Sequence, residues 1–302
     1  MKGYLLVLAA GILWGSLGIL GKYLYGYGID PLTVVTFRAL FAFLGLLIIV
    51  IIKFPSLLKI KRSDLLFFAL FGLISVTCFY TLYFYTVRLT DVATAAVLLY
   101  TAPAFVTLLS AKIFKERITK QKLISLFSTF LGCLFVVKAY NFAHLRLSYL
   151  GIITGLGSGF TYALFSIFGK KGLEKYNEWI VLFYAFAFGT IFFLIVNNPI
   201  AAFRSNYPLA VWLLLLALAL GPTLLANFFY TSGLKYIEAS KASILATVEP
   251  VIAALLAYFL LKERLEVLQL LGIILVIGGV VFTKIARQQM ENEQKKDEKI
   301  QG

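Results

Sequence analysis

The chain has 302 residues, of which 61% are hydrophobic and only 14% are charged. Soluble domains are about half apolar and about a quarter charged, so this composition excludes an ordinary water-soluble fold. The formal net charge of +14 is spread over the connections between apolar stretches, which disfavours a nucleic-acid-binding patch.

Ten apolar stretches follow one another along the chain, each near the length of about 20 residues that a membrane-spanning helix needs. They lack the alternating pattern of a membrane β-barrel, and backbone groups in lipid must bond internally. We therefore predict an all-α polytopic membrane protein. The expected spans are 4–24, 31–52, 65–86, 92–113, 121–138, 148–169, 179–197, 209–232, 239–261 and 267–284.

The basic residues favour one orientation of these spans. Most of the 28 Lys and Arg residues lie in segments that are cytoplasmic if the N-terminus is cytoplasmic, as the positive-inside rule requires. The signal is strong in the first half and weak near Lys262 and Arg264, which this topology places outside. We expect a multi-pass protein of the cell (inner) membrane with both termini in the cytoplasm and no cleaved signal peptide.

The second half of the chain repeats the first. Pro103 recurs as Pro250, and Lys115-Glu116-Arg117 recurs as Lys262-Glu263-Arg264, both 147 positions later. A block of five spans ends on the side opposite to its start, so a second copy is inserted upside down. We predict two inverted five-helix repeats, 1–140 and 141–285, followed by a charged cytoplasmic tail, 286–302.

Two segments of the repeats resemble a known family. AAVLLYTAPAFVTLLSAKIFKERIT (95–119) and ASILATVEPVIAALLAYFLLKERLE (242–266) are similar to the paired repeats of the EamA family of the drug/metabolite transporter superfamily. GILWGSLGILGK (11–22) and LGIILVIGGVVF (271–282) fit the same family. The resemblance, over 3–285, implies a ten-helix bundle with a central substrate cavity in a secondary transporter that exports small metabolites, with amino acids the leading class. It does not specify the substrate.

Glu249 is the one carboxylate expected deep inside a span, and Ala102 occupies the equivalent place in the first repeat. A charge at that depth costs at least ~2.5–3.5 kcal/mol, so the carboxylate must face a cavity, meet a partner or carry a proton. It either binds a substrate amine or couples protons, or it braces the helix beside Pro250.

Arg38 is the one basic residue expected well inside a span. It either binds a substrate carboxylate or acts as a charge partner for Glu249. Alternatively, it extends toward the membrane surface or bonds a backbone carbonyl.

Pro103 and Pro250 lie in the middle of equivalent predicted spans. Each proline removes a backbone donor and weakens the preceding turn. The pair is either a gating bend or a static kink, and its recurrence favours a shared mechanical role.

Several polar aromatic side chains are expected deep in the membrane, where a phenol needs a hydrogen-bond partner. They either line an apolar cavity or pack between helices, and the deep amide of Asn227 either binds substrate or bridges two helices. The predicted substrate-binding set is Trp14, Tyr80, Tyr83, Tyr100, Tyr162, Asn227 and Glu249.

The sequence contains few groups that could catalyse a reaction or bind a cofactor. It has no Walker motif and no clustered metal ligands, and its single histidine, His144, is expected in an outer loop. We therefore predict no enzyme activity, no catalytic residue, no cofactor and no metal. The alternative class is a lipid or lipid-linked-sugar flippase component. Proton coupling, the direction of net transport and the oligomeric state are left open.

Overall fold

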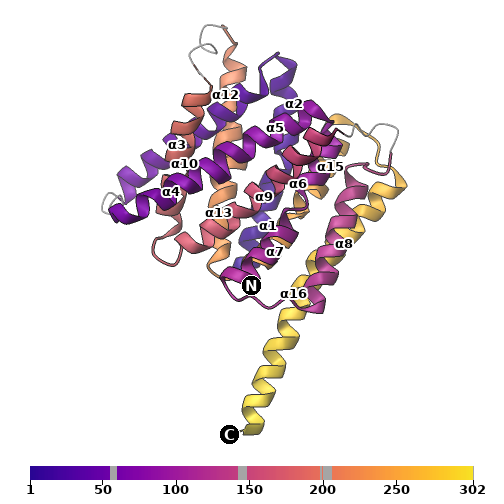
Figure 1. Ribbon diagram of the computed structural model, residues 1–302. Coiled ribbons are helices and arrows are strands. Elements are labelled where there is room, and N and C mark those ends of the chain that lie inside the picture. Colours follow the sequence, from indigo (N-terminus) through magenta and orange to yellow (C-terminus); the bar gives the residue numbers. More distant parts are fainter. Residues whose placement is uncertain (55–59, 142–147, 198, 200–205, 302) are drawn as a thin grey trace.

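The computed structural model describes residues 1–54, 60–141, 148–197, 199 and 206–301, and all regular structure in these ranges is helical (Figure 1). The α-helices are α1 (Lys2–Gly15), α2 (Leu17–Gly26), α3 (Pro31–Lys53), α4 (Leu65–Gly72), α5 (Phe79–Leu89), α6 (Val92–Leu99), α7 (Ala102–Ile113), α8 (Lys120–Val136), α9 (Tyr149–Gly172), α10 (Glu178–Val196), α12 (Leu209–Ala219), α13 (Ala226–Leu234), α14 (Ala239–Ala246), α15 (Val248–Leu261) and α16 (Val267–Gln301).

Nine helical segments of the described chain are long and apolar enough to cross a bilayer. They lie within a few residues of nine of the predicted spans, since hydropathy alone sets where such helices occur. The remaining predicted span, 121–138, coincides with α8, which has 17 residues and is not among the nine. The all-helical membrane fold is confirmed, whereas the tenth span stays a prediction.

Two of the spans are broken at equivalent places. The helix pair α6 and α7 is interrupted at Tyr100, and the pair α14 and α15 is interrupted at Thr247, 147 positions later. Pro103 is the second residue of α7, and Pro250 is the third residue of α15. A proline is tolerated in the first turn because N–H groups there have no partner within the helix. The breaks thus lie just before the two prolines.

Two further spans each contain a wide π-helical turn, η3 (Leu73–Cys78) and η5 (Leu220–Leu225). The two turns are also 147 positions apart. Such turns are rare and frequently occur at functional sites. In η5, Pro222 lacks an N–H group, which fits the local departure from α-helical bonding.

Helices α8 and α16 lie side by side and run in opposite directions (Figure 1). A β-carbon at Gly132 would lie 2.8 Å from the carbonyl oxygen of Gly272, and one at Gly279 would lie 3.0 Å from that of Ser125. Only glycine therefore permits this close backbone approach. Between these contacts, the Ser128 hydroxyl donates to the carbonyl oxygen of Leu275 at 2.9 Å.

The polar connections form two clusters, at opposite ends of the bundle. We call the first the Glu116 end, where Glu116 meets Lys170 at 3.3 Å and Lys175 meets Asp64 at 3.0 Å. The second is the Glu263 end, where Glu263 meets Lys22 at 3.0 Å. The N-terminus lies at the Glu116 end, and α16 runs past that same end to Gln301 (Figure 1).

Candidate substrate site

Glu249 lies in the first turn of α15, immediately after the break at Thr247. The positive end of a helix dipole favours a carboxylate at such a position. The side chain is half-buried, and its carboxylate forms no hydrogen bond or ion pair with any described residue. The helix break thus brings an unpaired acid into the protein interior.

Four of the predicted phenols lie in the same region as this carboxylate. Tyr80, Tyr83, Tyr100 and Tyr162 all lie within electrostatic range of Glu249. They come from three segments: α5, the break after α6, and α9. Residues far apart in sequence therefore converge on one acid.

Aromatic contacts join this group to α1. The Trp14 indole lies 6.2 Å from the ring of Tyr162, edge to face, and 5.2 Å from that of Tyr230. The ring of Phe79 lies 5.1 Å from that of Tyr162 and 4.8 Å from that of Tyr80. Such pairs contribute about 0.5–1.5 kcal/mol beyond area burial, so they fix the walls of the site.

Arg38 reaches the same region from α3. Its guanidinium lies over the Tyr80 ring, 4.6 Å from the centroid, and its Nε donates to the Thr223 hydroxyl at 2.5 Å. Its charge also interacts with that of Glu249. Because the described contacts use Nε and the face of the guanidinium, they leave its two terminal nitrogens for a further ligand.

Thr223, in η5, was not among the predicted site residues. Its hydroxyl accepts from Arg38 and donates to the carbonyl oxygen of Leu218 at 2.9 Å, five residues earlier. Asn227 donates to the Thr223 carbonyl oxygen at 2.7 Å, so its amide bonds within its own helix. The one sequence signal for this turn is Gly221-Pro222 in the middle of an apolar span.

The arrangement has a clear chemical capacity. A guanidinium and an unpaired carboxylate lie within electrostatic range of each other, in a region rich in aromatic side chains. Such a site suits a solute whose anionic group meets the guanidinium, whose cationic group meets the carboxylate and whose apolar body contacts the rings. The described residues contain no cluster of three potential metal ligands, and His144 lies outside the described residues.

The sequence profile of the EamA-like transporter family matches residues 1–138 and 149–285. An uncharacterized transporter of Archaeoglobus fulgidus is 30% identical, covering 88% of this chain and 91% of its own length. The uncharacterized inner membrane transporter YicL of Salmonella typhimurium is 26% identical, covering 94% and 95%. A solved crystal structure superposes with a TM-score of 0.81 at 17% identity, covering 96% of this chain and 98% of that one, so the two share a fold.

Proposed function

The chain belongs to the EamA-like transporter family, and from this premise we propose that it exports small amphipathic metabolites, such as amino acids, by alternating access. The observation that carries the substrate class is that Arg38 and Glu249 lie within electrostatic range of each other in one site walled by aromatic side chains. An amino acid offers a carboxylate to the guanidinium and an ammonium to the carboxylate, while the rings contact its side chain.

We also assign proton coupling to Glu249. A carboxylate in a span is costly unless it is paired or protonated, and Glu249 has no hydrogen-bonding partner among the described residues. A substrate ammonium would neutralise it. When the substrate leaves, a proton takes its place, which ties substrate movement to proton movement.

The contacts of α8 with α16 support the inverted repeat. Ser128 and Leu275 are 147 positions apart, and they bond to each other. Gly132 is equivalent to Gly279, and Ser125 is equivalent to Gly272, at the same offset. The close contact of Gly132 with Gly272 is therefore equivalent to that of Gly279 with Ser125. An antiparallel pair that crosses at its own equivalent residues is what a two-fold axis in the membrane plane produces.

The helix breaks support a mechanical role for the prolines. A β-carbon at Gly11 would lie 2.4 Å from a methyl carbon of Val248, and one at Gly159 would lie 2.7 Å from the hydroxyl of Thr101. Each break is thus packed against a span of the other repeat. We propose that the segments that begin at Pro103 and Pro250 pivot at these breaks as the site changes sides.

The orientation follows from charge. The segments at the Glu116 end are the basic segments that the positive-inside rule assigns to the cytoplasm. We therefore propose that both termini and the Glu116 end are cytoplasmic. Export would then carry substrate from the Glu116 end to the Glu263 end.

Purified protein in liposomes tests the proposal. We expect flux of radiolabelled amino acids and no movement of fluorescent lipid. Glu249→Gln should abolish accumulation against a gradient while leaving exchange intact, and Arg38→Lys should weaken both, because an ammonium cannot replace the bidentate fork. Glu174→Gln, in the exposed Lys171–Glu174 pair, is the matched control. Lipid movement without amino acid flux would support the flippase alternative instead.

A further inference from the structure

A carboxylate at the Glu116 end caps a helix far along the chain. Glu116 follows α7, yet its Oε1 accepts from the backbone N–H of Ala239 at 2.8 Å, and its Oε2 accepts from that of Ser240 at 3.2 Å and from the Ser240 hydroxyl. These donors are the first turn of α14, 123 and 124 residues later. The Glu116 side chain is only 5% exposed, so the first repeat closes on the second here.

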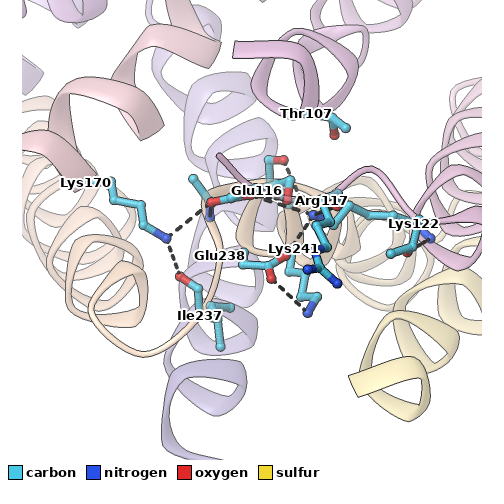
Figure 2. A network of polar contacts seen from close by, with 12 residues as sticks. Thr107, Glu116, Arg117, Lys122, Lys170, Ile237, Glu238 and Lys241 are labelled. Atoms are coloured by element: carbon cyan, nitrogen blue, oxygen red, sulfur yellow. Dashed lines mark hydrogen bonds and ion pairs between the residues drawn. The ribbon is translucent and has the colours of Figure 1, made fainter. Parts of the chain in front are cut away.

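Two lysines complete this contact (Figure 2). Lys170 of α9 approaches Glu116 at 3.3 Å and the carbonyl oxygen of Ile237 at 3.1 Å. Lys122 of α8, 3% exposed, lies 2.8 Å from Glu238 and 3.8 Å from Glu116. We name Glu116, Lys122, Lys170, Glu238 and Ser240 the Glu116 latch. It joins α7, α8, α9 and α14 at one end of the molecule.

The Glu263 end holds only part of the equivalent contact. Glu263 is the counterpart of Glu116, and Lys22 is the counterpart of Lys170 at an offset of 148. They pair at 3.0 Å, but their side chains are 56% and 60% exposed. The helix that Glu263 would cap is α6, the counterpart of α14. Its first turn is instead bonded by its own Asp91, which accepts from the Thr94 N–H at 2.9 Å.

Helix packing is also more complete at the Glu116 end than at the Glu263 end. At the Glu116 end, α7 packs on α14. Their counterparts at the Glu263 end are α15 and α6, which share at most a marginal contact within the described residues. The two repeats are therefore in contact through α7 and α14 at the Glu116 end, whereas the equivalent α15 and α6 are apart at the Glu263 end.

We propose that Glu116 and Glu263 are two alternating latches, of which one is engaged at a time. When the Glu116 end opens, Glu116 separates from α14. Glu263 then accepts hydrogen bonds from the backbone N–H groups of Val92 and Ala93 in α6, while its ion pair with Lys22 remains. Charge-assisted bonds to helix N-termini are strong and directional, and each needs a rigid-body approach of two helices. The inference rests on the alternating access proposed above and adds the parts that hold each state.

The latches are unequal in composition. The counterpart of Lys122 is Gln269, which is engaged with the carbonyl oxygen of Val136 at 2.9 Å and the N–H of Glu266 at 3.1 Å. The counterpart of Ser240 is Ala93, which has no hydroxyl. The Glu263 latch therefore keeps one cation, Lys22, but lacks the second cation and the hydroxyl donor of the Glu116 latch. The state closed at the Glu116 end is favoured when no substrate is bound.

Distances between spin labels, measured by pulsed electron resonance on the full chain in lipid nanodiscs without substrate, test this. One label pair, Arg117 with Lys235, spans the Glu116 end, and its counterpart, Arg264 with Arg88, spans the other. Each pair is introduced as two cysteines for labelling, in a protein whose native cysteines are removed by Cys78→Ala and Cys133→Ala. We expect Glu116→Gln to raise the population open at the Glu116 end by roughly tenfold or more, with shortening at the Glu263 end to match.

Three further variants make the test specific. Lys122→Gln copies Gln269 and should shift the same populations in the same direction but less. Glu263→Gln should leave the Glu116 end closed and slow transport, because the other end can no longer be held. Glu174→Gln, in an exposed pair at the Glu116 end, should change no distance. A size-exclusion profile of each variant that matches that of the parent protein would confirm that the variant is folded.

The proposal is overturned if neither Glu116→Gln nor Lys122→Gln changes the distances. It is equally overturned if the Glu116 end opens without shortening at the Glu263 end. Because the measurement uses no substrate, its outcome is separate from that of the flux assay. If the two distances change in opposite directions as expected but the protein shows no amino acid flux, the proposed substrate class is wrong and the latch proposal still stands.

Discussion

At the scale of single residues, the site depends on how one guanidinium is held. Arg38 is oriented by the face of Tyr80 and by the hydroxyl of Thr223. Neither contact neutralises it, so the cation is positioned and its charge is left for a ligand. Because Thr223 sits in a wide turn, its hydroxyl also bonds a carbonyl five residues back, which fixes its direction.

Thr223→Val should therefore weaken substrate binding without removing any charge. Valine keeps the shape of threonine but cannot accept the Nε–H, and a buried donor left unpaired costs about 1–3 kcal/mol. We expect affinity in a thermal-shift titration to fall roughly tenfold, while Thr223→Ser stays close to the parent protein. Equal affinities for the valine and serine variants would show that this hydrogen bond does not position Arg38.

At the scale of elements, hydropathy predicted where the helices lie but not how they meet. The boundaries of 31–52 and 92–113 match α3 and α6–α7 within a residue, because long apolar runs are unambiguous. The capping of α14 by Glu116 and the wide turn around Thr223 were missed. A cap from 123 residues away leaves no local pattern, and a single extra residue in a turn hardly changes the average hydropathy of a span.

The contact of α8 with α16 gives a paired test of element packing. A β-carbon at Gly279 would lie 2.7 Å from a methyl carbon of Thr129, whereas nothing lies within 4 Å of one at the adjacent Gly278. Gly279→Ala should destabilise the protein by about 1–3 kcal/mol through overpacking. Gly278→Ala should be neutral or gain up to about 1 kcal/mol from helix propensity.

Thermal unfolding in detergent, followed by tryptophan fluorescence, measures both glycine variants against the parent protein. We expect a lower midpoint for Gly279→Ala alone. Equal midpoints for the two variants would mean that α8 and α16 do not approach as closely as their backbones indicate, and the equivalence of Ser128 with Leu275 would lose its main support.

At the scale of the whole molecule, the equivalences at one offset extend from the helix breaks to the π-helical turns and the latches. The family match covers both halves of the chain, yet the two halves are not in equivalent surroundings. Glu116 is buried among donors, and Glu263 is exposed. Two similar halves in different states are what alternating access requires, since exchanging the states moves the open end to the other side of the membrane.

Alternating access through an inverted repeat requires that the two Lys-Glu-Arg motifs lie on opposite faces of the membrane. Single cysteines at Arg117 and Arg264, in a protein without Cys78 and Cys133, should react with a membrane-impermeant maleimide from opposite sides of intact cells and inverted vesicles. Arg264→Cys should label from outside, because the orientation proposed above places the basic Glu116 end in the cytoplasm. A cysteine at Lys2 should label together with Arg117→Cys. Motifs that label from the same side would contradict the inverted repeat, and the two latches would no longer face opposite compartments.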